Sequence, residues 1–118
     1  MADFGLFIGF GAPVLGRERQ AIEGFNEVLE YNSRLQQEGE IESFETVLLE
    51  PHGGELGGFI LLRGDQDKLA RIRTSDEFQR HITRGLLTVE NLGVVGASLG
   101  ERIATLTSLF AEQLEQLT

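Results

Sequence analysis

The sequence predicts an α+β domain whose elements follow the order β-α-β-β-α-β, with one more helix at the C-terminus. Three observations predict it: an alternating apolar strand near the N-terminus, a glycine-rich turn between two further apolar strands, and helical apolar spacing in the remaining segments. The chain has 118 residues, of which 41% are hydrophobic and 25% charged. A single domain over residues 1–118 is therefore expected.

The first strand and the first helix follow from their apolar spacing. Alternate residues of the segment 4–10, "FGLFIGF", are apolar and share one face of a strand. From about residue 17 to 37, apolar side chains fall within about 60° of Phe25 on a helical wheel, and Gly39 follows as a terminating glycine. Asn32 lies only about 20° from Phe25, so a polar amide is expected inside the apolar stripe.

The next two strands form a predicted hairpin. Residues 41–49, "IESFETVLL", and residues 59–63, "FILLR", are strand-like runs. Between them lies "EPHGGELGG", whose glycines and proline are typical of a turn. Asp65 is placed to cap the helix that follows.

That following helix is predicted to be broken. The apolar stripe changes sides within it, so two pieces are expected, over about residues 65–73 and 75–84, with a bend between them. Thr74 and Glu77 have the spacing of a capping box, which would start the second piece. Gly85 is expected to close it.

A fourth strand and a last helix complete the chain. Residues 86–97, "LLTVENLGVVGA", are predicted to form a strand that bends near Gly93. Ser98 and Glu101 have capping-box spacing and would start a C-terminal helix. Its apolar residues lie within about 40° of one line: Leu99, Ile103, Leu106, Phe110, Leu114 and Leu117.

This order is the split β-α-β pattern of ferredoxin-like folds, in which helices cover one face of the sheet. Several of the predicted strands are nevertheless apolar on both faces, as in "FILL" and "LFIGF". Something must therefore cover the second face. Either the C-terminal helix or a second copy of the chain could do so, and we favour a homodimer.

The element order, the hairpin, the broken helix and the stretch "TSDEFQRHI" resemble the dimeric α/β-barrel superfamily. That superfamily includes antibiotic-biosynthesis monooxygenases, heme-degrading monooxygenases, YCII-like proteins and stress-responsive barrel proteins. The resemblance covers about residues 4–97. It implies a homodimer whose two sheets close a barrel, and a cleft between sheet and helices in each subunit. Members oxygenate, isomerise, degrade heme or only bind, so the fold alone does not choose an activity.

The heme-degrading branch can be compared residue by residue. Its members carry an asparagine on the first strand, a tryptophan near the third strand, and a histidine four residues after the phenylalanine that matches Phe78. Here the first strand has no asparagine and the chain has no tryptophan. Ile82 occupies the fourth place, and the histidine is His81. No heme, and no other cofactor, is therefore expected.

The charge excludes two classes of partner. The net charge is −9, from 19 acidic and 10 basic residues, and no basic run occurs. Binding to nucleic acid or to an anionic membrane draws on such cations, so neither partner is expected. The N-terminal apolar run is short and broken by glycine, so we read it as a strand rather than a signal peptide. With no cysteine, a cytoplasmic location is expected.

Four residues are candidates for a ligand site. His81 lies at the edge of the apolar side of its helix, where a neutral imidazole could act as a base. Asn32 must find a hydrogen-bond partner in the core or in a ligand. Glu90 is read as a strand carboxylate that could orient a ligand. Arg84 could bind a ligand or form an ion pair at a dimer interface. His52 lies far from His81 in sequence, so no metal site is predicted.

Two hypotheses about function follow. In the first, a small homodimeric α/β-barrel protein binds an apolar or aromatic molecule in the helix–sheet cleft, with cofactor-free oxygenase or isomerase-like chemistry. His81 would be the base or hydrogen-bond donor, and Asn32, Glu90 and Arg84 would bind the ligand. In the second, the fold is a non-catalytic binding or accessory module. A cavity lined by both Asn32 and His81 would favour the first.

Overall fold

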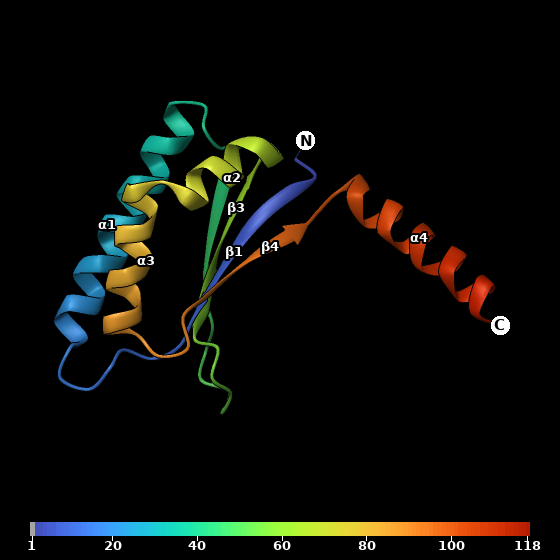
Figure 1. The fold of residues 1–118 in the computed structure, drawn as a ribbon. Helices are drawn as coiled ribbons and strands as arrows, with labels where there is room; N and C mark the ends of the chain where they lie inside the picture. The colour runs from blue at the N-terminus through green and yellow to red at the C-terminus, as the bar shows by residue number, and fades with distance from the viewer. Residues whose placement is uncertain (1) are drawn as a thin grey trace.

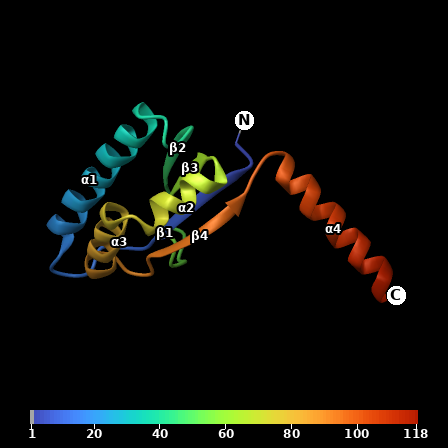
Figure 2. The ribbon, with the colours of Figure 1, turned by 45° about the horizontal axis from the view of Figure 1, so that its top comes forward.

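The computed structural model describes residues 2–118 and has the predicted α+β architecture (Figure 1). One antiparallel sheet has the strand order β2-β3-β1-β4. Helices α1, α2 and α3 cover one face of it, whereas α4 stands away on the other side (Figures 1 and 2). The bounds are β1 (Phe4–Phe10), α1 (Glu18–Gln37), β2 (Ser43–Leu48), β3 (Gly58–Gly64), α2 (Gln66–Thr74), α3 (Asp76–Thr88), β4 (Gly93–Ser98) and α4 (Glu101–Leu117).

The break between α2 and α3 confirms the predicted pair of short helices, with a different cap. The side chain of Asp65 accepts a hydrogen bond from the Lys68 amide, as expected for the cap of α2. Ser75, rather than Thr74, caps α3, because its hydroxyl accepts from the Phe78 amide. Thr74 ends α2, and its hydroxyl donates back to carbonyls of that helix.

The predicted strand over residues 86–97 is wrong in its first half. Helix α3 continues through Gly85 to Thr88, and the strand begins only at Gly93. Gly85 does not end the helix; it makes room for Leu92, whose Cδ2 would lie 2.9 Å from an added Cβ. A glycine inside a helix can serve close packing in this way, and its sequence signal is then the same as that of a terminator.

The predicted capping box at the start of α4 is also wrong. Ser98 belongs to β4, and Gly100, with a φ of 54°, precedes the helix. The amide of Glu101 donates instead to the Asp3 carboxylate at 3.3 Å, and the Leu99 amide donates to the Asp3 carbonyl at 2.8 Å. A partner almost a hundred residues earlier in the chain thus replaces the local cap.

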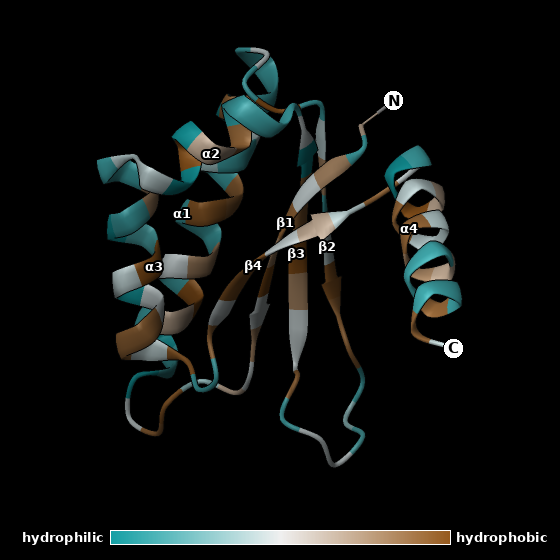
Figure 3. Ribbon diagram, turned by 45° about the vertical axis from the view of Figure 1, so that its right-hand side comes forward, coloured by the Kyte–Doolittle hydropathy of each residue, from teal (hydrophilic) through white to brown (hydrophobic). Residues whose placement is uncertain are grey.

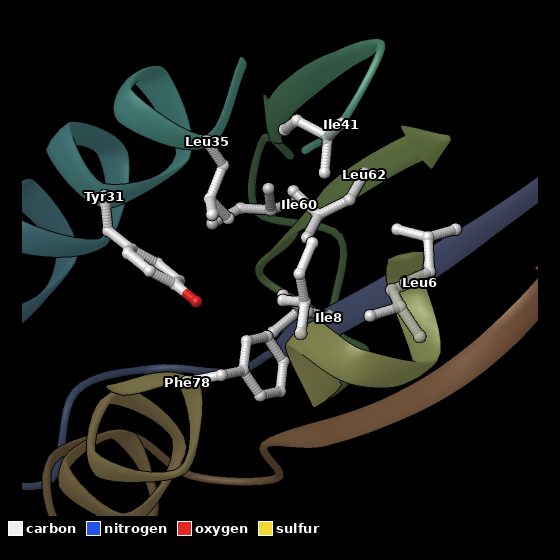
Figure 4. Close-up of a cluster of buried hydrophobic side chains, with 10 residues drawn as sticks. Leu6, Ile8, Tyr31, Leu35, Ile41, Ile60, Leu62 and Phe78 are labelled. Atoms are coloured by element: carbon white, nitrogen blue, oxygen red, sulfur yellow. The ribbon is translucent and has the colours of Figure 1, made fainter. Parts of the chain in front are cut away.

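The core lies between the sheet and helices α1–α3 (Figure 4). Leu62, on the central strand β3, is 0% exposed and lies opposite Leu6 of β1. Tyr31 and Leu35 from α1 and Phe78 from α3 point into the same layer. Apolar burial of this kind is the dominant stabilising contribution in a small domain. The buried cluster is Leu6, Ile8, Tyr31, Leu35, Ile41, Ile60, Leu62, Leu69, Ile72 and Phe78.

No helix lies on the opposite face of the sheet (Figure 3). We call it the open face; by the strand registers it carries Phe7, Val47, Phe59, Leu61 and Val95. The rings of Phe7 and Phe59 stack at 5.1 Å, and Val95 is 57% exposed. None of the residues of α4 is buried, so this helix does not cover the face in the monomer.

Arg84, a candidate for a ligand contact or an interface ion pair, and Arg63 both form ion pairs within the chain. Arg63 lies 3.3 Å from Glu45 on the neighbouring strand, and Arg84 of α3 pairs with Glu27 of α1. All four side chains are substantially exposed, so each pair contributes little to stability. Within residues 2–118, no helix is both long enough and apolar enough to cross a membrane.

Candidate ligand-binding site

A cavity of about 490 Å³ lies between the helices and the sheet. Ligand cavities commonly have volumes of roughly 300–1,000 Å³ and mainly apolar walls with a few polar groups. This cavity fits both criteria, and its wall includes the exposed residues Ile22 and Leu48. Its walls are Ile8, Phe10, Gly11, Ala12, Pro13, Ala21, Ile22, Gly24, Phe25, Val28, Tyr31, Asn32, Leu48, Leu49, Gly57, Ile60, Phe78, His81, Ile82, Arg84, Gly85, Thr88, Val89 and Leu92.

Asn32 supplies a buried polar group at this cavity. Its residue is 1% exposed, as the helical wheel predicted for a position within the apolar stripe of α1. Its Nδ2 has no hydrogen-bond partner among residues 2–118. A buried donor without a partner costs about 1–3 kcal/mol. The amide can therefore donate to an acceptor placed in the cavity.

Three side chains of α3 line the cavity: the two sequence candidates on that helix and one threonine. His81, Arg84 and Thr88 follow one another at helical spacing and line the same wall. The Thr88 hydroxyl donates a hydrogen bond to the Arg84 carbonyl at 2.9 Å. Its donor is therefore satisfied although the residue is buried. The Ser75 cap and buried Phe78 fix the start of the helix and hence the position of this wall.

His81 and Tyr31 meet across the helix pair. Their ring centroids lie 4.8 Å apart with an angle of 36° between the planes. Burial raises the pKa of the Tyr31 phenol, opposed by its hydrogen bond with Ser75. Burial lowers the pKa of the His81 imidazole, more than the nearby Glu77 carboxylate raises it. At neutral pH the cavity therefore presents a neutral imidazole and a protonated phenol.

Tyr31 was not among the sequence candidates. It lies off the stripe centred on Phe25, although it is 6% exposed. The signal that could have found it is the spacing of Val28, Tyr31 and Leu35, which continues the inward face of α1 at steps of three and four.

Glu90 lies elsewhere than expected. It belongs to the bend between α3 and β4, not to a strand, and its residue is exposed. Its backbone bonds to the loop after β1, donating to the Ala12 carbonyl at 2.8 Å and accepting from the Gly11 amide at 2.7 Å. The cavity wall includes no Asp or Glu, so its ionisable groups are Tyr31, His81 and Arg84.

The lowered pKa of His81 predicts a pH effect on stability. Because the folded state binds the proton less well than the unfolded state, the free energy of unfolding should fall as pH drops below the ordinary histidine value of 6.5. Glu77 and Glu27 oppose this shift and Arg84 and Arg34 add to it, but burial is the largest cause. His81→Gln should gain stability relative to wild type between about pH 7 and pH 5 in urea titrations.

A parallel pH series on His52→Gln separates the effect of burial from the loss of any histidine, because His52 lies in the exposed turn between β2 and β3. If the difference in free energy of unfolding between wild type and His81→Gln were independent of pH, the partly buried, uncharged imidazole would be contradicted.

Comparisons with known proteins place the fold. No family model and no curated protein matches the chain. A DABB-family protein with a ferredoxin-like fold from Mesorhizobium loti matches with a TM-score of 0.62 and 14% identity, covering 85% of this chain and 100% of its own. A dimeric ferredoxin-like protein of unknown function from Jannaschia sp. matches with a TM-score of 0.62 and 13% identity, covering 81% and 99%.

The third comparison is SnoaB, a cofactor-independent oxygenase from Streptomyces nogalater. Its TM-score is 0.54 at 15% identity, covering 84% of this chain and 95% of its own. These likenesses show that the chain has the ferredoxin-like fold. The three matches leave 15–19% of this chain without a counterpart, and α4 holds 17 of the 118 residues.

Proposed function

We propose that this chain is a homodimeric α/β-barrel protein that binds an apolar or aromatic small molecule in the cavity between its helices and sheet. The observation that carries the proposal is the buried Nδ2 of Asn32, which lacks a partner beside an apolar cavity of about 490 Å³. An apolar core position would otherwise favour a side chain without a donor.

The walls indicate what the ligand should look like. A flat or compact apolar body would contact Phe10, Phe25 and Leu92, which lie on three different segments of the wall. An oxygen acceptor on the ligand, such as a carbonyl or a phenolic oxygen, would accept from Asn32. A site of this kind rejects an analogue without the acceptor, because the buried donor is then left unpaired.

The chemistry that this cavity supports best is proton abstraction by His81. The imidazole is neutral at pH 7 and lines the cavity, and no carboxylate competes with it as a base. Removal of an acidic proton from a carbon or a phenol is a first step open to both cofactor-free oxygenation and isomerisation. Arg84 would stabilise the anion formed. Glu90 has no part in this proposal, since its residue is exposed outside the cavity wall.

The open face supports the homodimer. Phe7, Phe59, Leu61 and Val95 form an apolar surface on the side of the sheet that carries no helix. A surface of this kind is typical of a protein interface. The solved protein from Jannaschia sp. with the same fold is described as dimeric. Two copies joined face to face would shelter both sheets.

A matched pair of substitutions at Gly24 tests the cavity as the binding site. An added Cβ at Gly24 meets only ordinary contacts with Arg84, the nearest at 3.7 Å, so larger side chains can enter. Gly24→Leu and Gly24→Ala should both raise the melting temperature, because glycine destabilises the interior of a helix by about 1 kcal/mol relative to alanine. Only Gly24→Leu should occupy the cavity and abolish the thermal shift produced by a panel of naphthols, flavonoids and quinones.

Three results would count against the proposal. Equal ligand shifts in Gly24→Leu and wild type would place binding elsewhere. No shift from any member of the panel, nor from alkyl phenols, would remove the evidence for a ligand. Shifts unchanged in His81→Ala would exclude His81 from the site.

A further inference from the structure

We propose that α4 is an exchanged arm, which packs its apolar stripe on the other copy of the chain in the homodimer. The inference rests on the proposed homodimer and adds the surface that would hold it together. We call Leu99, Ile103, Leu106, Phe110, Leu114 and Leu117 the stripe.

Apart from Leu99, which precedes α4 and covers Gly5, the stripe packs on no other part of residues 2–118. Phe110 is 72% exposed, Leu114 54% and Leu117 85%, and no residue of α4 is buried. Helices in proteins, including one of 17 residues such as α4, draw most of their stability from tertiary packing of an amphipathic face. Its apolar face therefore needs a surface to pack on.

The contacts between the start of α4 and the N-terminal residues direct the helix away from its own sheet. The amides of Leu99 and Glu101 both donate to Asp3, through its carbonyl and its carboxylate. The Arg102 guanidinium lies 5.9 Å from the centre of the Phe4 ring, a cation–π contact in the first turn. These contacts hold the helix in the outward direction of Figure 1, so folding back onto its own sheet would break them.

The stripe is continuous with the open face. Leu99 and Leu61 both cover Gly5 of β1, where their Cδ1 atoms would lie 3.0 and 3.1 Å from an added Cβ. The first residue of the stripe thus joins the apolar surface of the sheet. In Figure 3, α4 lies across from that surface, on the side away from α1, α2 and α3. A sheet that packed on the open face would sit about 10 Å from it and would come within reach of the arm.

A second copy is the partner that meets both surfaces. Each copy offers one open face and one stripe, and a two-fold arrangement makes every contact between the copies twice. The charges of the open face agree with this, because Glu45 and Arg63 pair within the chain. Two such faces can therefore meet without repulsion between like charges, despite the net charge of −9 on each chain.

A charged substitution on the stripe tests the arm in the full chain. Leu106→Glu with Phe110→Glu should raise the dimer dissociation constant at least about tenfold in sedimentation equilibrium, because the carboxylates would be buried at the interface. Ser108→Glu adds the same kind of charge on the opposite side of α4 and should leave the constant within about twofold. Equal dimer dissociation constants for the stripe variant and wild type would contradict the proposal that α4 packs on the other copy.

Hydrogen exchange on the wild-type chain gives an independent measurement. The amides of α4 should become protected over the same range of protein concentration in which the dimer forms. Protection at every concentration would mean that α4 packs on its own chain, and no protection in the dimer would mean that it packs on nothing. Either result overturns the arm while leaving the homodimer intact; a chain that stays monomeric overturns both.

Discussion

Leu62→Ala is expected to lower the free energy of unfolding by about 2–5 kcal/mol, the range for a buried leucine that leaves a cavity. Leu62 is 0% exposed at the centre of the helix-covered face of β3. The total free energy of unfolding of a domain of this size is about 5–15 kcal/mol, so the variant should be only marginally stable at room temperature. Urea denaturation followed by circular dichroism measures the loss.

Leu61→Ala is the matched control, one residue earlier and on the opposite face of the same strand. Its effect should depend on protein concentration, because Leu61 belongs to the proposed interface rather than to the core. Leu62→Ala should lose stability equally at all concentrations. A loss below about 1 kcal/mol at Leu62 would contradict the central position of that side chain.

Asn32→Leu is expected to stabilise the protein while abolishing ligand binding. Leucine has nearly the same shape as asparagine and removes the donor that lacks a partner. The free energy of unfolding of the ligand-free protein should rise by about 1–3 kcal/mol. The thermal shift with any ligand that binds wild type should disappear. A fall in stability would show that the amide already has partners in the folded chain.

Asn32→Asp is the control of equal size with an added charge. A buried carboxylate has a raised pKa, so the folded state holds its proton to higher pH than the unfolded state. Stability should therefore decline as pH rises above about 3.9, the ordinary aspartate value. The variant should be less stable at neutral pH than in mild acid, measured as the difference from wild type. A difference that did not change with pH would place residue 32 in contact with water.

The sequence was informative where local periodicity decides the structure. The wheel around Phe25 placed Asn32 inside the core face, and the change of stripe before Phe78 separated α2 from α3. The ferredoxin-like order followed from these elements, because a split β-α-β pattern has few alternative arrangements.

The sequence misled where a distant residue decides the structure. Gly85 resembles a helix terminator, but it makes room for Leu92. Ser98 and Glu101 have the spacing of a capping box, but the carboxylate that accepts from the Glu101 amide is that of Asp3, near the other end of the chain. The false strand then placed Glu90 at a candidate site, although its residue lies exposed in a bend. The meeting of Tyr31 with His81 depends on how two helices pack, which no local pattern contains.

The bond between Asp3 and the start of α4 has a practical consequence for anyone who prepares this protein. An affinity tag placed directly before Asp3 would lie beside Gly100, the residue that precedes α4. A bulky or charged fusion there could turn α4 and change the assembly that is purified. Crystallisation and light-scattering samples should therefore carry no tag at that end, or should have it cleaved before their mass is measured.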